Sequence, residues 1–279
     1  MKPFALTAFA LTAFSFNSIL CRMALAAGEI DPASFTTVRL VSGAVVLAAL
    51  VLASRKTLSA AKSGNWFSAF FLFAYAVAFS FAYLGLTTAT GALILFGCVQ
   101  LTMFGVSLYL GVRPKPIEWI GLAVAFGGLV YLMLPGLSAP PLNSALLMAA
   151  AGIAWGGYTL RGKGSENPLA DTAGNFLRSV PMVLSVALVF LPNLAASWRG
   201  VGWAVLSGAI ASGVGYSVWY TALKYHMPTR AAVLQLSVPI ITAVLGILLL
   251  AETASWRLIT AGVLILGGIG LTLIQRKNG

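Results

Sequence analysis

The sequence predicts an all-α integral membrane protein with ten transmembrane helices, arranged as two inverted five-helix repeats around a central cavity. The first observation is composition. Hydrophobic residues make up 59% of the 279 residues, charged residues make up 8%, and the mean hydropathy is +0.95, whereas about a quarter of the residues in soluble domains are charged. The second observation is an internal repeat, because residues 1–138 resemble residues 139–279 at a nearly constant offset.

The repeat is visible on both sides of a Pro/Gly-rich seam, LPGLSAPPLN, at residues 134–143. Four segments of the first half match segments of the second half in the same order: SFNSILCR with AWGGYTLR, SFTTVR with AGNFLR, FSFAY with YSVWY, and GLAVAFGGLVYL with AGVLILGGIGLTL. The offset is about 137 to 140 positions in all four. A duplicated five-helix unit is therefore expected.

Ten apolar runs are long enough to cross about 30 Å of hydrocarbon as helices. They are continuously apolar, without the alternation of a barrel strand, so we expect helices. The expected spans are 4–27, 32–54, 65–86, 88–111, 116–135, 141–162, 169–191, 199–223, 229–250 and 256–275. The first resembles a signal peptide, with Lys2 before it and ALAAG at its end. Because Asn17 and Arg22 interrupt it and it has a repeat partner, we expect it to be retained as a helix.

Basic residues orient the spans, since they concentrate in cytoplasmic loops. If the N-terminus is cytoplasmic, twelve of the seventeen lie inside: Lys2, Arg55, Lys56, Lys62, Arg113, Lys115, Arg161, Lys163, Lys224, Arg230, Arg276 and Lys277. Three lie outside, namely Arg22, Arg199 and Arg257. Both termini are therefore expected in the cytoplasm, and the net charge of +11 reflects topology, with no nucleic-acid partner. Five spans per half make the second repeat inverted, an arrangement that recurs in secondary transporters.

The end of the chain, LQLSVPIITAVLGILLLAETASWRLITAGVLILGGIGL (234–271), resembles the closing helix pair of the ten-helix, EamA-type branch of the drug/metabolite transporter superfamily. Pro239, Glu252, Gly262 and the pair Gly267–Gly268 carry the likeness. The first half is similar more loosely. It has Gly121, Gly127 and Gly128, but the position equivalent to Glu252 falls in Gly-Val-Arg at 111–113 and is not acidic. No proline occupies the position equivalent to Pro239.

The resemblance implies a bacterial inner-membrane exporter of amino acids or other small metabolites that works by alternating access around a central cavity. The abundance of aromatic residues on spans three, six and eight is most similar to the bacterial aromatic amino-acid exporter group. A passive channel and an exporter of other small molecules (cationic drugs, nucleotide precursors or sugars) remain the alternatives. Coupling to protons is open, and a monomer is expected.

Polar and aromatic side chains inside the spans are the candidates for substrate binding. Buried polar groups in a bilayer face the bundle interior or water, and aromatic residues at helical spacing share a face. The candidates are Asn17, Tyr75, Phe79, Tyr83, Gln100, Trp155, Tyr158, Trp219 and Gln235. Trp155 leads, because its repeat partner Phe16 adjoins Asn17. The alternatives are interhelical hydrogen bonds for the polar residues and lipid contact for the aromatic ones.

Four further residues are candidates for a gate or hinge: Arg39, Arg178, Pro181 and Pro239. The two arginines are repeat partners about 10 Å inside their spans. Snorkelling to the nearer interface is the leading explanation, and a role as a gate or as the receptor of a substrate carboxylate is the alternative. Pro239 crowds the carbonyl of Gln235 and is expected to kink span nine.

Small residues, among them Gly208, Ser212 and Gly127, are expected to allow close helix contact. The acidic residues all lie in loops or at span ends: Glu29, Asp31, Glu118, Glu166, Asp171 and Glu252. Exchange of a lipophilic cation for a proton needs a buried carboxylate, so a neutral or zwitterionic substrate is favoured.

Other chemistry is not indicated. His226 is expected to be solvated in a loop, and Cys21 and Cys98 lie in apolar runs that suggest neither a disulfide nor a metal site. No nucleotide-binding loop, HExxH motif or catalytic pair occurs, so neither an enzyme nor a cofactor is expected.

Overall fold

The computed structural model describes residues 2–54, 63–111, 113–136, 139–162, 164–226 and 234–274. Their regular structure is helical, apart from one isolated β-bridge between Ile30 and Ala196. The helices are α1 (Lys2–Ala26), α2 (Pro32–Ala53), α3 (Trp66–Ala82), α4 (Thr88–Tyr109), α5 (Pro116–Met133), α6 (Leu142–Gly162), α7 (Pro168–Val189), η1 (Leu191–Asn193), α8 (Trp198–Val205), η2 (Leu206–Val214), α9 (Gly215–Leu223), α11 (Ser237–Leu250) and α12 (Trp256–Ile274).

Each predicted span corresponds to a helix or, for the eighth, to the continuous run α8–η2–α9. Six runs of described residues are long and apolar enough to cross a membrane: Phe4–Ala26, Pro32–Ala53, Thr88–Tyr109, Pro116–Met133, Pro168–Val189 and Trp198–Leu223. Three apolar helices are shorter: Trp66–Ala82, Ser237–Leu250 and Trp256–Thr272. The prediction of an all-helical membrane protein is confirmed.

Several sequence predictions fall on residues outside the described ranges. These are residues 229–233 of the ninth span, residue 275 of the tenth, residues 137–138 of the seam, and seven cations used for orientation: Arg55, Lys56, Lys62, Lys163, Arg230, Arg276 and Lys277.

Local sequence explains where several helices begin. Asp31 caps α2 by accepting hydrogen bonds from the backbone N–H groups of Ala33 and Ser34, both over 2.9 Å, and a proline follows it. Asn65 caps α3 and Thr87 caps α4 in the same way. A side-chain oxygen that satisfies an unpaired N–H, followed by a pre-set proline φ, favours helix initiation.

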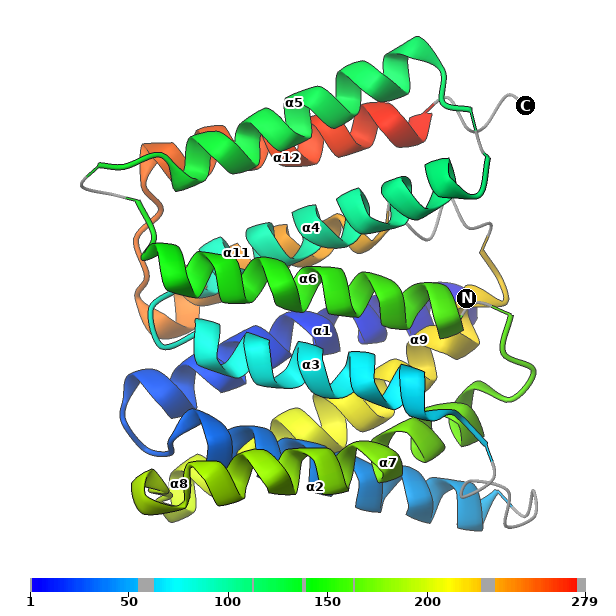
Figure 1. The fold of residues 1–279 in the computed structure, drawn as a ribbon, viewed down its shortest axis with the longest axis vertical. Coiled ribbons are helices and arrows are strands. Elements are labelled where there is room, and N and C mark those ends of the chain that lie inside the picture. The colour runs from blue at the N-terminus through cyan, green and yellow to red at the C-terminus, as the bar shows by residue number, and fades with distance from the viewer. Residues whose placement is uncertain are drawn as a thin grey trace.

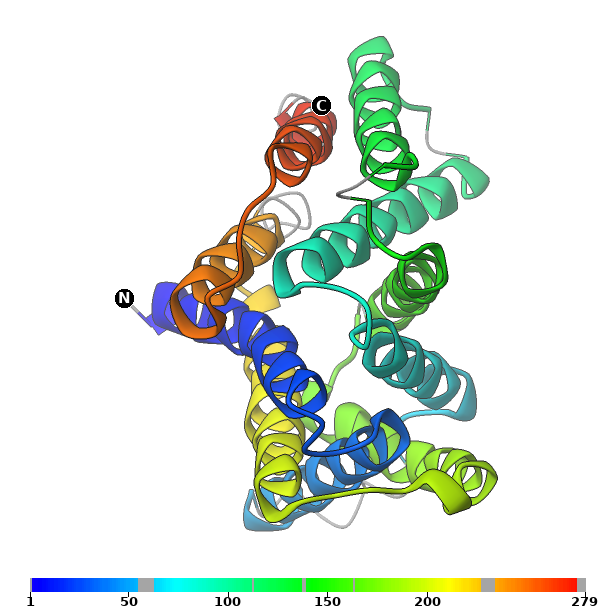
Figure 2. The same cartoon turned by 90° about the vertical axis from the view of Figure 1, so that its left-hand side faces the viewer.

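The two halves of the chain interleave. In Figures 1 and 2, α5 lies beside α12 at one side of the molecule, and α2 and α7 lie at the opposite side. Contacts between the halves come in matching sets. Helix α3 packs on α6 as α9 packs on α1, and α4 packs on α6 as α11 packs on α1. Helices α1 and α6, the first helices of the two halves, therefore lie in the middle of the bundle.

Helices α5 and α12 meet through two facing glycines. A Cβ atom added to Gly121 would lie 2.5 Å from the carbonyl oxygen of Gly268, and one added to Gly268 would lie 2.5 Å from the carbonyl oxygen of Gly121. Such close backbone approach requires the absence of a side chain. The prediction that Gly127 makes a close helix contact is wrong, because a Cβ there would meet nothing within 4 Å.

The eighth span contains a π-helical segment, η2. Because a π-helix closes its hydrogen bonds over five residues, Ser207 and Ser212 come to lie on the same face. Gly208 lets this segment approach α2, since an added Cβ would clash with the carbonyl oxygen of Arg39. The wide turn therefore brings two hydroxyl groups against the middle of the bundle.

Candidate functional site

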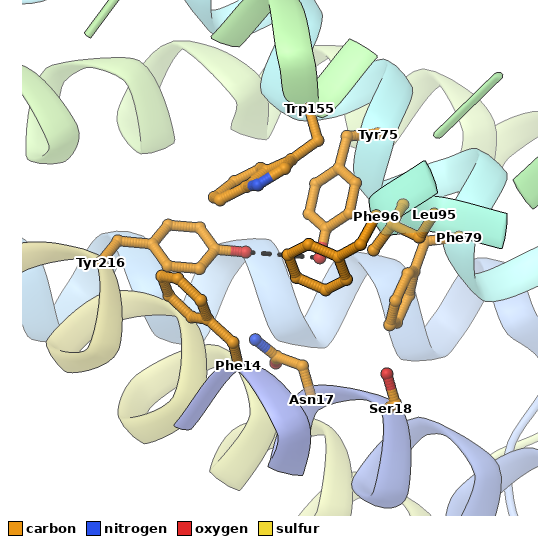
Figure 3. Close-up of a pocket in the computed structure, with 9 residues that line it drawn as sticks. All are labelled: Phe14, Asn17, Ser18, Tyr75, Phe79, Leu95, Phe96, Trp155 and Tyr216. Carbon is orange, nitrogen blue, oxygen red and sulfur yellow. Dashed lines mark hydrogen bonds between the residues drawn. The ribbon is translucent and has the colours of Figure 1, made fainter. Parts of the chain in front are cut away.

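A small cavity lies between the halves, with a volume of about 10 Å³. Its lining comes from both of them (Figure 3): Phe14, Asn17, Ser18, Tyr75, Phe79, Leu95, Phe96, Trp155 and Tyr216. Such a volume has room for about one water molecule. Four of the predicted binding residues, namely Asn17, Tyr75, Phe79 and Trp155, meet here.

Asn17 is held by the π-helical segment. Its side chain is 2% exposed, and its Oδ1 accepts hydrogen bonds from the Ser207 hydroxyl over 2.8 Å and the Ser212 hydroxyl over 3.2 Å. The carbonyl side of the amide is thus occupied by two donors. Figure 3 shows the amide of Asn17 directed toward the cavity.

Arg39 lies at the centre of the polar network behind the cavity wall. Its Nε donates to Ser212 Oγ over 3.2 Å, and its Nη2 donates to the hydroxyl oxygens of Tyr75 over 3.0 Å and Tyr216 over 3.3 Å. The guanidinium also lies over the rings of Tyr75 and Phe79, with its carbon 5.2 Å and 4.9 Å from their centroids.

The leading explanation for Arg39, snorkelling to the interface, is wrong, because the side chain is 1% exposed. The physical reason is that hydroxyl groups and aromatic faces contributed by α3, η2 and α9 replace the water that the side chain would otherwise seek.

Aromatic rings form most of the wall. The ring of Trp155 is centred 4.9 Å from that of Tyr75 and 4.8 Å from that of Tyr216. Phe14 meets Trp155, Tyr216 and Trp219 edge-on, with centroids 6.0, 5.6 and 5.7 Å apart. Such pairs stabilise a fixed arrangement beyond simple burial. Aromatic rings therefore form most of the lining, and polar groups of Asn17, Ser18, Tyr75 and Tyr216 lie among them.

Other predicted binding residues lie around this cavity without lining it. Trp219 is buried against Phe14, and Tyr158 is buried against Trp155. Asn175 Nδ2 donates to the Tyr158 hydroxyl over 3.5 Å. Gln100 lies about one turn beyond Phe96 on α4, and its Nε2 is buried without a hydrogen-bond partner. Gln235 is buried ahead of α11.

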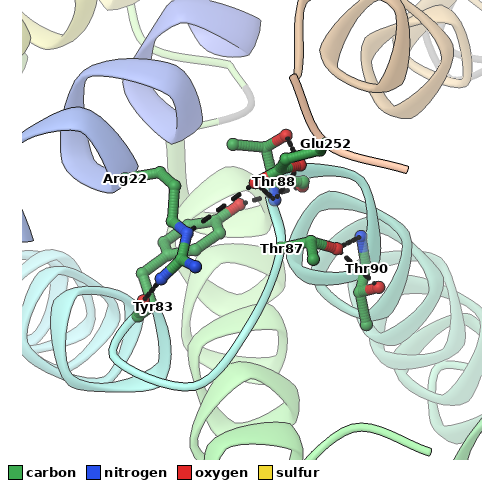
Figure 4. A network of polar contacts seen from close by, with 6 residues as sticks. All are labelled: Arg22, Tyr83, Thr87, Thr88, Thr90 and Glu252. Atoms are coloured by element: carbon green, nitrogen blue, oxygen red, sulfur yellow. Dashed lines mark hydrogen bonds and ion pairs between the residues drawn. The ribbon is translucent and has the colours of Figure 1, made fainter. Parts of the chain in front are cut away.

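Tyr83 belongs to a network at one end of the bundle, shown in Figure 4. The Glu252 carboxylate accepts hydrogen bonds from Thr88 N over 2.9 and 3.1 Å and from Thr88 Oγ1 over 2.6 Å, and it lies 3.7 Å from Arg22 Nε. Arg22 Nη1 donates to the Tyr83 carbonyl over 3.1 Å, and the Tyr83 hydroxyl donates to the Thr88 carbonyl over 3.3 Å. A carboxylate at the start of α4 also suits the helix dipole. This network ties α1, the α3–α4 turn and the α11–α12 connection together.

Beside this network lies a larger pocket of about 510 Å³. It is lined by Arg22, Met23, Ala26, Ala27, Glu29, Arg199, Trp203, Leu250 and Glu252.

The predicted gate and hinge residues are spread over the fold. Arg178 is partly buried, and its Nη1 donates to the carbonyl oxygens of Ser63 over 2.6 Å and Gly174 over 3.0 Å. Pro181 lies inside the continuous helix α7 and is exposed. Pro239 lies in the first turn of α11, after a helix break at Leu236, so the expected kink is a break.

The prediction that His226 is solvated is wrong. It is partly buried, its Nε2 lies 2.7 Å from Thr7 Oγ1, and its buried Nδ1 has no partner. The contact joins the start of α1 to the end of α9.

Two matching clasps connect the halves. In the Asp31 clasp, Asp31 Oδ2 accepts from the N–H of Ala195 over 2.9 Å, and the N–H of Asp31 donates to the Ala195 carbonyl over 2.8 Å. Burial alone would raise the pKa of the Asp31 carboxyl, but hydrogen bonds from Ser34, Ala195 and Ala33 outweigh it and lower the pKa. The carboxylate therefore stays ionised at neutral pH.

The Asp171 clasp is the counterpart. The N–H of Gly64 donates to Asp171 Oδ1 over 3.0 Å, and the N–H of Asn65 donates to Asn175 Oδ1 over 2.9 Å. Each clasp joins the start of the second helix of one half to the residues that precede the third helix of the other half. Figure 1 places them at opposite ends of the helices: the α1–α2 turn and α8 lie to the left, and the start of α3 lies to the right.

Sequence reasoning missed Phe14, Ser18, Leu95 and Phe96 among the lining residues, and it noted Tyr216 among the aromatic residues of span eight without selecting it as a binding residue. Tyr216 carried a usable signal, because the repeat aligns it with Phe79. The others are apolar or small residues on helices that are apolar all round, where the pattern does not indicate a face. No group of three or more His, Cys, Asp or Glu that could hold a metal ion occurs in the described part of the chain.

Comparison with known proteins identifies the family. Residues 142–274 match the EamA-like transporter family. An uncharacterized protein of Pseudomonas aeruginosa is 48% identical over 97% of this chain and 94% of its own length. The threonine/homoserine exporter RhtA of Escherichia coli (strain K12) is 28% identical over 62% of this chain and 60% of the exporter's length.

A crystal structure 20% identical in sequence superposes with a TM-score of 0.69 and covers 96% of this chain and 97% of that chain, which shows a shared fold. Together with the helices and apolar spans of the described residues, these matches define the class. The chain is a multi-pass membrane protein that belongs to the EamA-like transporter family of the drug/metabolite transporter superfamily.

Proposed function

We propose that this protein exports amino acids or similar small metabolites across the bacterial inner membrane by alternating access. The observation that carries the proposal is the cavity itself. It lies between the two halves and takes its lining from both, and a clasp joins the halves at each end of the helices.

The proposed cycle treats residues 1–138 and 139–279 as inverted repeats. The matching contacts of the two halves support this assignment, as does the correspondence between the Asp31 and Asp171 clasps. Opening one end requires the clasp at that end to separate while the other holds. With both clasps formed and a cavity for about one water molecule, the arrangement corresponds to a closed state between the two open ones.

We assign both termini to the cytoplasm from the distribution of basic residues. The Asp31 clasp and the Glu252 network then lie at the periplasmic end, and the Asp171 clasp lies at the cytoplasmic end. The 510 Å³ pocket beside Arg22 and Glu252 becomes a vestibule on the exit side.

Amino acids are the substrates to examine first, and threonine and homoserine lead, since RhtA relatives are named as exporters of these two. The aromatic wall can contact an ammonium group through its ring faces or surround an apolar side chain. The proposed gate or hinge residues remain Arg178, Pro181 and Pro239. Two further polar residues, Gln100 and Gln235, remain proposed substrate-binding residues.

Counterflow in proteoliposomes tests the proposal. Vesicles are preloaded with one unlabelled amino acid at a time, and uptake of the labelled form is followed. Saturable uptake of a subset is expected, with a loss of at least about tenfold in Trp155→Ala, since the indole forms the wall between Tyr75 and Tyr216. Trp198→Ala is the matched control, because Trp198 is 92% exposed, and Trp155→Phe guards against misfolding.

The other outcomes separate the alternatives. Flux that does not saturate and shows no exchange would indicate a passive channel. Folded protein that moves none of the amino acids would contradict the amino-acid assignment and direct the search to cationic drugs, nucleotide precursors or sugars.

A further inference from the structure

Arg39 is a buried cation without a buried anion. It is 1% exposed, and no carboxylate within the described part of the chain forms an ion pair with it. Its hydrogen-bond acceptors are three neutral hydroxyl groups, and its Nη1 is buried without any partner. Burying a charge is costly unless an opposite charge compensates it, so the site is set up for an anion supplied from elsewhere.

The guanidinium fixes the direction of a hydrogen-bond chain toward the cavity. Since it can only donate, Ser212 Oγ accepts from Arg39 Nε, and the Ser212 hydrogen is left to donate to Asn17 Oδ1. Ser207 donates to the same oxygen. The carbonyl of Asn17 is therefore occupied, and its NH₂ group is the end of the chain that faces the cavity.

A second chain ends in the same way. Arg39 Nη2 donates to the hydroxyl oxygens of both Tyr75 and Tyr216, and the Tyr216 hydroxyl donates to the Tyr75 oxygen over 3.5 Å. The Tyr75 oxygen accepts from the guanidinium, which can only donate, and this leaves its own O–H to donate. Donation from a cation polarises a hydroxyl and makes it a stronger donor.

The remaining lining residues are consistent with a cavity lined by hydrogen-bond donors. Trp155 has an indole N–H that can only donate. None of the lining residues carries a carboxylate. The cavity therefore presents hydrogen-bond donors on a wall backed by one positive charge.

We propose that this wall binds the carboxylate of the substrate, with Tyr75 O–H and Asn17 NH₂ as the donors and Arg39 as the compensating charge. The proposal rests on the proposed transport function and narrows its substrates to small carboxylates, amino acids among them. One positive charge and a few neutral donors suit a carboxylate monoanion, and they disfavour a cationic drug. The rest of the substrate would meet the rings of Phe14, Phe79 and Trp155 once the halves move apart.

The test compares each amino acid with its amide, which keeps the α-ammonium group and lacks the carboxylate. Binding to purified protein is followed by tryptophan fluorescence with the pairs threonine and threoninamide, leucine and leucinamide, and phenylalanine and phenylalaninamide. At least one acid is expected to bind about tenfold or more tightly than its amide, a difference of about 1.4 kcal/mol. Acids that bind no better than their amides would overturn this inference and leave the transport proposal standing. If none of the acids binds or is transported, both fail.

Two variants, each with a control, locate the effect. Tyr75→Phe removes one O–H and is expected to weaken acid binding about tenfold while leaving amide binding unchanged. Tyr109→Phe, at a side chain that is 90% exposed, is the matched control. Arg39→Gln is expected to remove the preference for acids, with Arg113→Gln at an exposed arginine as its control. An unchanged acid preference in folded Tyr75→Phe and Arg39→Gln would contradict the proposal.

Asn17→Asp gives a readout that a merely structural role would not produce. The new carboxylate supplies Arg39 with an internal anion while it keeps an acceptor for Ser207 and Ser212. We expect the melting temperature to rise, acid binding to be lost, and the amides to bind at least as well as before. Asn193→Asp, in an exposed turn, should change none of these. Acid binding that survives in Asn17→Asp would count against the assignment.

Discussion

Glu252 is a single side chain that joins three parts of the chain. Its carboxylate accepts three hydrogen bonds from Thr88 and lies 3.7 Å from Arg22. Replacing it with glutamine removes the charge and one acceptor, and hydrogen bonds to charged groups contribute about 1.5–3 kcal/mol each. We expect Glu252→Gln to lower the free energy of unfolding by about 1–3 kcal/mol, measured as a lower melting temperature of the purified protein. Glu166→Gln, at an exposed carboxylate, is the control, and an equal effect of both would contradict the role of the network.

At the same scale, the sequence located part of the candidate site. Asn17, Tyr75, Phe79 and Trp155 line the cavity. An amide in an apolar span faces the bundle interior, and aromatic residues at helical spacing share one face. Arg39 was misjudged, since its partner Ser212 is 173 positions away and is presented by a π-helical turn that the residue pattern does not indicate. How completely a charged side chain is buried in a membrane protein therefore depends on partners that are distant in sequence, as well as on its position within a span.

The pair α5–α12 shows what a helix contact requires. The backbones approach so closely at Gly121 and Gly268 that a methyl group at either would lie 2.5 Å from the opposite carbonyl oxygen. Overpacking of this kind costs about 1–3 kcal/mol. We expect Gly121→Ala and Gly268→Ala to lower the melting temperature, whereas Gly127→Ala and Gly267→Ala, where an added Cβ meets nothing within 4 Å, should not. Four equal melting temperatures would show that the contact contributes no stability.

The helices themselves were predictable within a few residues, because each expected span is a long apolar run and caps such as Asp31, Asn65 and Thr87 carry recognisable side chains. The predicted third span, 65–86, extends four residues beyond the end of α3 at Ala82, because Tyr83–Leu86 are mostly apolar. The π-helical segment and the break at Leu236 could not be foreseen, because both depend on packing between the halves.

For the whole molecule, alternating access predicts that holding one end closed stops transport. Ile30 and Ala196 pair in an antiparallel bridge within the Asp31 clasp, at a separation suited to a disulfide. We expect the double variant Ile30→Cys with Ala196→Cys to lose counterflow when oxidised and to regain it when reduced. Either single cysteine variant should be insensitive to oxidant. Full counterflow in a completely cross-linked double variant would show that this end does not open during transport.

The placement of Arg39 has an electrical consequence. Its charge lies inside the span, about 10 Å from the start of α2, and therefore within the field that the membrane potential creates. Carrying one charge through the whole field takes about 2.3 kcal/mol per 100 mV. A rocking motion that shifts α2 through even part of the field would then make the rate of transport depend on voltage, even for a zwitterionic substrate that crosses without a coupled ion.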